Sequence, residues 1–391
     1  MIKMDKKTIS VFFMLLRSAI TEKSLTDEEK AECLEADFES MFGFAVSQDM
    51  GHLIGEALGQ NKITIEQELG EAFRAKAFRA MFRYDTIIAD YENICSIFED
   101  EKIAFIPLKG SVIRDFYIKP WLRTSCDIDI LVRPEIVDEA TQVLVEKAGY
   151  TKRFKGTHNV SLFSPNGVHI ELHFRLMEKG LANNASSVLE DVWETALVKD
   201  GYEYWMSMPD ELFYFYHVAH MAKHFENGGC GIRPFLDLWI LNRMDFGGTK
   251  KTDLLKKGGL EKFSEIASYL SCVWLEGKSH NKVSEKMQQY IFSGGLYGVD
   301  ENRIALKQQQ KGGKVRYAIS KIFIPYDEIK YHYPILQKYS WLTPVMEVRR
   351  WGKLIFYGHL GRTTKELAYN DNLSSEQADN MKVFLKDIGL L

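Results

Sequence analysis

The sequence lacks an apolar run long enough to cross a membrane, so a protein built from spanning helices is not expected. It has no Cys-x-x-Cys pair, and its five dispersed cysteines fit reduced thiols in a cytoplasmic protein better than a disulfide framework or a zinc ribbon. A net charge of only −4 gives no overall attraction to nucleic acid, which disfavours a polymerase or tRNA-tailing role. Internal repeats and low-complexity segments are also absent. The remaining class is a globular protein with an ample apolar core.

Two aspartates lie in a segment that otherwise predicts a buried strand. On a strand, Asp127 and Asp129 share one face about 6.6 Å apart, whereas Ile128 and Ile130 face the opposite side. Like charges this close are usually neutralised by a metal ion, a basic partner or open solvent. A solvated strand end is the alternative, but the apolar residues that follow favour a buried strand. The pair therefore predicts a site for a divalent cation.

A Gly-Ser turn precedes the two acids. Residues 103–108 read as a short strand, and residues 111–117 read as the start of a helix. At such a junction free backbone N–H groups and the positive end of a helix dipole favour an anion. Gly110 permits close backbone approach, and Ser111 can cap the helix or donate its hydroxyl to a phosphate.

These residues carry a family resemblance. Lys109-Gly110-Ser111, Arg123 and Asp127–Ile130 resemble the signature of the polymerase-beta-like nucleotidyltransferase superfamily. More narrowly, LKGSVIRDFY…LRTSCDIDILV resembles a bacterial family of uncharacterised nucleotidyltransferases. The resemblance implies a third carboxylate on a later strand.

Glu171 matches this third acid. Residues 160–163 and 168–174 predict a β-hairpin around the turn Ser164–Gly167. In its second strand the apolar residues share one face, and Glu171 lies on the other between His169 and His173. The alternative is an outward-facing Glu171 paired with Arg175.

The resemblance implies chemistry at these positions. Asp127, Asp129 and Glu171 would hold Mg²⁺ or Mn²⁺. The metal would activate an acceptor hydroxyl for attack on the α-phosphorus of an NTP. Glu171 or Asp129 would be the general base. Gly110 and Ser111 would hold the leaving pyrophosphate, and Lys109 or Arg123 would add positive charge unless they form surface ion pairs. His169 and His173 are expected to shape the site rather than bind the metal, because hard cations prefer oxygen ligands.

A histidine stripe lies downstream, within Glu211–His224. Helical spacing places His217, His220 and His224 on one side of a helix. No H-E-x-x-H motif or cysteine supports a zinc site, so we expect either a lining of the active site or hydrogen-bonded packing. By the family resemblance, further residues could face the nucleotide or the acceptor; they are His220, Lys223, His224, Arg233 and Asp237. For Asp237 an ordinary i,i+4 ion pair with Arg233 is the preferred interpretation.

The expected fold is α+β, with a small mixed β-sheet flanked by helical regions. We predict an N-terminal helical region over 1–100, a nucleotidyltransferase core over 101–180 and a C-terminal helical region over 181–391. Long helical patterns cover Glu71–Phe98, and a helix over Glu135–Ala148 should end before Gly149.

The predicted function is metal-dependent transfer of an NMP group from an NTP to a hydroxyl-type acceptor, which the sequence leaves open as a small molecule, a protein or RNA. One alternative is a glycosyltransferase that uses the Asp-x-Asp pair on a nucleotide sugar, although this class expects a nucleotide-binding β/α region before the acids. The other is a catalytically silent nucleotide-binding or regulatory module, which is favoured if Glu171 lies far from Asp127 and Asp129.

Overall fold

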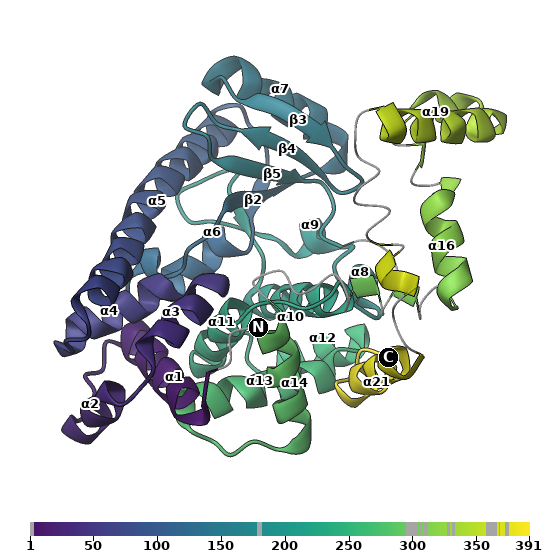
Figure 1. The fold of residues 1–391 in the computed structure, drawn as a ribbon. Coiled ribbons are helices and arrows are strands. Elements are labelled where there is room, and N and C mark those ends of the chain that lie inside the picture. The colour runs from purple at the N-terminus through teal and green to yellow at the C-terminus, as the bar shows by residue number, and fades with distance from the viewer. Residues whose placement is uncertain are drawn as a thin grey trace.

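The structure is a computed structural model with a small mixed sheet between two groups of helices (Figure 1). It describes residues 4–177, 182–294, 303–304, 307–308, 312–326, 329–330, 333–356, 366, 368–371 and 375–391. The predicted α+β class is confirmed. The three predicted domain boundaries remain predictions.

Five helices precede the first strand. They are α1 (Lys6–Thr21), α2 (Asp27–Leu34), α3 (Phe38–Ser47), α4 (Gly51–Asn61) and α5 (Gln67–Asp100). The Asp5 side chain caps α1 by accepting a hydrogen bond from Thr8 N. The long helix α5 packs its first half on α4, where Gly55 lies against the backbone of Phe73, and its second half on the sheet. The described residues before β1 are mainly helical, as the sequence predicted.

The sheet has the order β1-β2-β5-β4-β3. Its strands are β1 (Phe105–Pro107), β2 (Asp127–Val132), β3 (Thr151–Lys155), β4 (Asn159–Phe163) and β5 (His169–His173). The strands β2 and β5 are parallel, and the other neighbours are antiparallel. The predicted hairpin is confirmed as β4 and β5. Because β5 also adds beside β2, the hairpin brings its second strand next to the two aspartates.

The two faces of β2 meet different environments. Ile128, Ile130 and Val132 are fully buried against the second half of α5 and against α7 (Val137–Ala148). The helix α7 ends as predicted, with Gly149 in the left-handed conformation. Asp127 and Asp129 point to the opposite side, towards the later helices.

Helices dominate the rest of the chain. The longer ones are α10 (Asp210–Glu226), α11 (Arg233–Arg243), α12 (Lys250–Gly258), α13 (Glu261–Glu276), α14 (Lys282–Ser293), α16 (Lys314–Ile322), α19 (Thr343–Phe356) and α21 (Ser375–Asp387). Short elements are α6 (Gly110–Ile113), α8 (Ala185–Val188), α9 (Val192–Thr195), α18 (Ile335–Lys338) and the pair β6 (Leu197–Val198) and β7 (Met206–Ser207). In Figure 1, α10 and α11 lie beneath the sheet, whereas α16 and α19 stand to one side. None of the described helices has the length and apolar content needed to cross a membrane.

Candidate active site

Acidic and imidazole side chains meet on one face of β2 and β5. The register of these parallel strands pairs Asp127 with His169 and Asp129 with Glu171. The ligand atoms of Asp127, His169 and Glu171 lie within 4.8 Å of one another, and so do those of Asp129, Glu171 and His173. Glu171 is thus close to both aspartates, and its carboxylate lies 3.2 Å from His173 Nε2. We call these five residues the acid face.

Asp129 is the most enclosed member of the acid face. Its side chain is 4% exposed, and Oδ1 accepts hydrogen bonds from Lys109 Nζ at 2.7 Å and from His173 Nε2 at 2.8 Å. Burial alone would raise the pKa of Asp129, but these two donors lower it well below the usual range. Burial likewise opposes the charge on Lys109, whereas Asp129 raises the pKa of this ammonium. The pair therefore keeps opposite charges inside the protein.

Asp127 has less compensation. Burial and the neighbouring charge of Asp129 raise the pKa of Asp127. Among the described residues it takes part in no ion pair. The carboxylates of Asp129 and Glu171 lie near Asp127, and Lys109 is the ammonium group close to them. The acid face therefore carries excess negative charge, which favours a divalent cation.

The turn before the acids differs from the sequence prediction. The helix expected over 111–117 is a single α-turn, α6, followed by a short 3₁₀ segment, so little helix dipole is available for an anion. The N–H groups of Ser111 and Val112 already donate to carbonyls within the turn. The Ser111 hydroxyl is buried and has no hydrogen-bond partner among the described residues. The Ser111 amide is therefore already used within the turn, whereas the expected contact of its hydroxyl with a phosphate remains a prediction.

Lys109 and Gly110 are held in a crowded, strained turn. Lys109 has φ 47° and ψ −121°, a conformation that residues other than glycine seldom adopt. A Cβ on Gly110 would lie 3.2 Å from Ser125 Cβ, so a side chain would press on the next segment. Arg114 fixes the turn, because its Nε donates to Gly110 O at 2.7 Å and its Nη2 donates to Ser125 Oγ at 3.0 Å. No sequence pattern indicates this role of Arg114.

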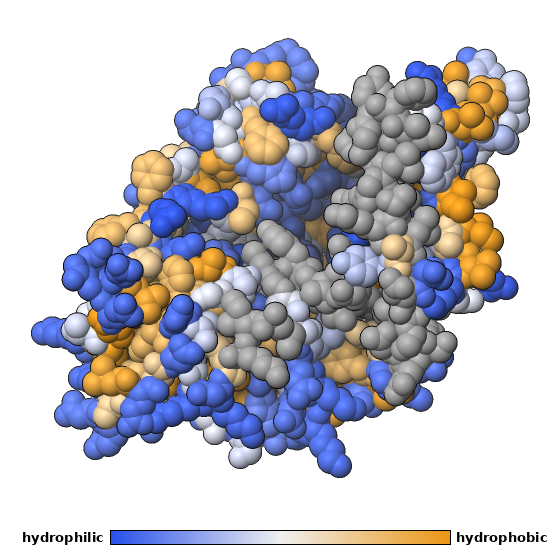
Figure 2. Space-filling model, viewed as in Figure 1, coloured by the Kyte–Doolittle hydropathy of each residue, from blue (hydrophilic) through white to orange (hydrophobic). Residues whose placement is uncertain are grey.

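A cavity of about 380 Å³ lies between the acid face and α10 and α11. Figure 2 shows a recessed, mainly hydrophilic area below the sheet. Of the predicted site residues, those that line the cavity are Lys109, Gly110, Arg123, Asp127, Asp129, Glu171, His173, His220, Lys223, His224 and Arg233. Ser111, and the acid-face residue His169, do not line it. The cavity therefore brings together positions from three distant parts of the sequence.

The histidine stripe faces this cavity. His217, His220 and His224 all line it, and His217 Nε2 lies 3.0 Å from Pro234 O. Burial, with the charges of Lys109 and Lys223 nearby, lowers the pKa of His224 to about 4, so its imidazole is neutral. These histidines belong to neither of the metal-competent groups found among the described residues. Of the two expectations for the stripe, the lining of the cavity is the one that the geometry favours.

Two aromatic residues of α10 were not predicted at the site. Phe213 and Tyr216 line the cavity together with the histidines. Both are buried, so their sequence pattern is that of an ordinary core helix. They give the wall opposite the acid face a partly apolar character.

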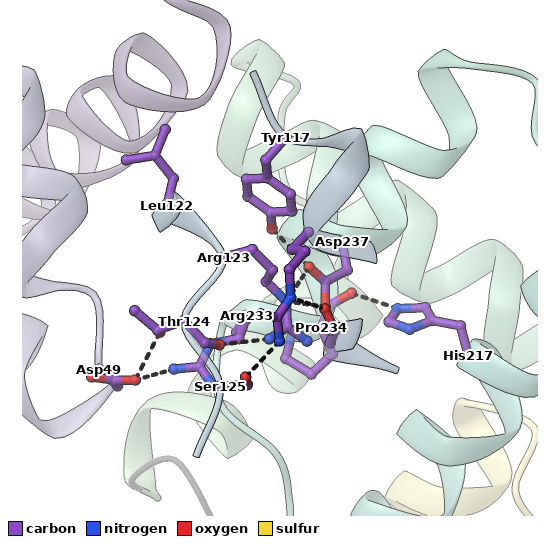
Figure 3. Close-up of polar contacts among 12 residues, drawn as sticks. Asp49, Tyr117, Leu122, Arg123, Thr124, Ser125, His217, Arg233, Pro234 and Asp237 are labelled. Carbon is purple, nitrogen blue, oxygen red and sulfur yellow. Dashed lines mark hydrogen bonds and ion pairs between the residues drawn. The ribbon is translucent and has the colours of Figure 1, made fainter. Parts of the chain in front are cut away.

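A buried ionic network holds Arg123 against the cavity (Figure 3). Its Nε donates to Asp237 Oδ1 at 2.8 Å and to Oδ2 at 3.0 Å, and Tyr117 OH donates to Oδ1 at 2.7 Å. Arg233 instead pairs with Asp49, which also accepts a hydrogen bond from Thr124. The predicted i,i+4 pair between Arg233 and Asp237 is therefore wrong. Asp237 is fully buried and pairs with Arg123, which lies in the segment before β2.

A family model for uncharacterised nucleotidyltransferases matches residues 35–275, which include the whole acid face, α10 and α11. The chain belongs to this family. It is therefore a nucleotidyltransferase, a transferase enzyme with a nucleoside triphosphate as substrate, as the sequence resemblance implied. Comparisons with curated proteins and with solved structures gave no match.

The family assignment bears on the two alternatives. A catalytically silent module was expected only if Glu171 lay far from the two aspartates, and the structure places it within 4.8 Å of both. A glycosyltransferase was expected to have a substantial β/α region before the acids. The described residues there form α1–α5, the short strand β1, the single turn α6 and short 3₁₀ segments. Nucleotidyl transfer is thus the activity with which both the family and the fold agree.

Proposed function

We propose that the protein transfers an NMP group from an NTP to an acceptor hydroxyl, with release of pyrophosphate and with help from a divalent metal ion. The observation that carries the proposal is the meeting of Asp127, Asp129 and Glu171 on two adjacent strands at the wall of one cavity. Three carboxylates are costly to bury together unless a cation offsets their charge.

The donor set fits such a cation. Each of the two groups on the acid face offers two carboxylates and one imidazole, whose ligand atoms lie within 4.8 Å of one another. When bound, Mg²⁺ or Mn²⁺ supplies charge stabilisation at the phosphates and lowers the pKa of the attacking hydroxyl. Asp127, Asp129 and Glu171 are the residues that would hold it.

Glu171 is the better of the two candidate general bases. Its side chain is 25% exposed, whereas that of Asp129 is 4% exposed. Asp129 is also fixed by Lys109 and His173, an arrangement that suits a rigid ligand. A base has to reach the proton that it accepts, so the exposed fraction favours Glu171.

Basic side chains around the cavity would bind the triphosphate. Lys109, Arg123, Lys223 and Arg233 line it, on the turn before β2 and on α10 and α11. Arg123 is pre-positioned by Asp237, so its orientation costs little side-chain entropy when the substrate binds. Gly110 lets the backbone approach the phosphates, because no Cβ projects from the crowded turn.

The wall on α10 would contact the other parts of the substrates. His220 and His224 line the cavity, and burial keeps both neutral by lowering their pKa values. Neutral imidazoles can donate and accept hydrogen bonds with a base, a ribose or the acceptor. We assign these residues to substrate contact rather than to proton transfer.

The test uses α-³²P-labelled NTPs, Mg²⁺ or Mn²⁺, the purified protein and a cell extract as the source of acceptors. We expect label transfer that falls at least about 100-fold in Asp127→Asn and Glu171→Gln, because each loses a charged metal ligand. Asp138→Asn is the matched control, since this exposed aspartate of α7 pairs with Lys155 and neither residue lines the cavity. Transfer that persists in both active-site variants would reject the proposed role of the acids. Preferential use of a nucleotide sugar would support the glycosyltransferase instead.

A further inference from the structure

We propose that the acid face binds first-row transition ions such as Mn²⁺ in preference to Mg²⁺, with His169 and His173 as direct ligands. This inference rests on the proposed function, because it concerns the metal at the same site. It revises the expectation that the two histidines only shape the site. Their placement on β5 is the observation that leads to it.

His173 lies between two carboxylates. Its Nε2 is 2.8 Å from Asp129 Oδ1 and 3.2 Å from Glu171 Oε2. The residue is only 4% exposed, and its buried Nδ1 has no hydrogen-bond partner in the part of the chain that the structure describes. The ring also stacks on His158 at a centroid distance of 5.9 Å. Held in this way, it directs Nε2 at the point where a cation would contact all three residues.

His169 shows a similar arrangement at the other end of β5. It lies opposite Asp127 in the register, and its ligand nitrogen is within 4.8 Å of the oxygens of Asp127 and Glu171. Ser161 Oγ lies 2.8 Å from His169 Nε2, and the ring of Phe163 stacks on the imidazole at a centroid distance of 4.9 Å. Outer hydrogen bonds of this kind orient imidazoles that ligate metals, and this one leaves Nδ1 for the cation.

Both groups therefore combine two carboxylates with one imidazole, and Glu171 belongs to each. Mg²⁺ prefers oxygen ligands in near-octahedral geometry and seldom accepts imidazole. First-row transition ions accept both carboxylate and imidazole, and their affinity for such mixed sets exceeds that of Mg²⁺. The identity of the ligands, rather than the size of the cavity, thus sets the preference.

The first measurement needs no variant. Isothermal titration of the full chain with MnCl₂ and with MgCl₂, without nucleotide, should give a Kd for Mn²⁺ at least about tenfold lower than that for Mg²⁺. Pulsed electron paramagnetic resonance of the Mn²⁺-loaded protein should show couplings to directly bound ¹⁴N. Equal affinities, or Mn²⁺ with no nitrogen coupling, would overturn the inference.

Variants then identify the nitrogens. His169→Gln and His173→Gln should each raise the Kd for Mn²⁺ about tenfold, reduce the ¹⁴N signal and change the Kd for Mg²⁺ less than about twofold. His224→Gln is the control, since this histidine lines the same cavity but belongs to neither group. A control variant that loses Mn²⁺ as strongly as the other two would count against the proposed ligands.

The outcome separates this inference from the proposed function. Nitrogen-bound Mn²⁺ in a protein that transfers no label from any NTP would refute the proposed function and leave the metal ligands standing. Label transfer with Mg²⁺, together with Mn²⁺ bound only through oxygen, would refute the ligand assignment and leave the function standing.

Discussion

Asp237→Asn tests whether the buried network in Figure 3 holds the segment that contains Tyr117 and Arg123 against α11. The change keeps the size of the side chain but leaves the guanidinium of Arg123 without its counter-charge. Asp237 is fully buried, and the side chain of Arg123 is 10% exposed. Removal of one partner from a buried ion pair costs about 3–5 kcal/mol, so we expect a loss of that size in the free energy of unfolding.

Urea denaturation at pH 7 measures this loss, with Tyr117→Phe as the matched variant. Tyr117 donates a single hydrogen bond to the same carboxylate at 2.7 Å, and its removal leaves the ion pair in place. We expect it to cost about 1.5–2 kcal/mol. In the double variant Arg123→Gln/Asp237→Asn, the cost should fall at least about 1 kcal/mol short of the sum of the single changes. Additive costs, or an Asp237→Asn change no larger than that of Tyr117→Phe, would refute the ion-pair argument.

Two further predictions concern the N-terminal helices. In α4, a Cβ on Gly55 would lie 2.4 Å from Phe73 O, whereas no described atom lies within 4 Å of a Cβ on Gly59. Gly55→Ala should therefore lower the melting temperature, and Gly59→Ala should leave it unchanged or raise it. Equal effects would contradict the close packing of α4 on α5. His52 is buried and donates to Leu122 O, and burial lowers its pKa from 6.5 to about 4. The unfolded chain thus binds the extra proton first, so stability is lost as the pH falls below 6.5, by about 2 kcal/mol at pH 5. His52→Gln should lessen this loss in urea titrations at pH 7 and pH 5, and an unchanged pH dependence would contradict the assignment.

The sequence predicted those parts of the site that depend on local pattern. The alternation of Asp127, Ile128, Asp129 and Ile130 identified both the strand and its two faces, because side chains on a strand alternate strictly. The hairpin of β4 and β5 was identified in the same way. The parallel pairing of β5 with β2 could not be predicted, since it depends on a contact between distant segments. Only the family resemblance pointed to Glu171.

The helix expected after the Gly-Ser turn shows where local pattern is insufficient. The apolar spacing of Val112, Ile113 and Phe116 suits a longer helix, yet α6 ends at Ile113. Arg114 donates its Nε to the Gly110 carbonyl, and the chain then tightens into a 3₁₀ turn. The buried contacts of Arg114 with this turn and with Ser125 outweigh the helical propensity of the next residues.

Asp237 shows the same limit for charge. An i,i+4 pair with Arg233 is worth only a few tenths of a kcal/mol on a solvated helix, whereas a fully buried carboxylate requires strong donors to offset its desolvation. Arg123 meets this need with Nε bonds to both oxygens, across 114 residues of sequence, and Arg233 turns to Asp49. The cost of burial therefore selects the distant partner over the near one. Because Arg123 also lines the cavity, this choice fixes a basic group where the proposed triphosphate would bind.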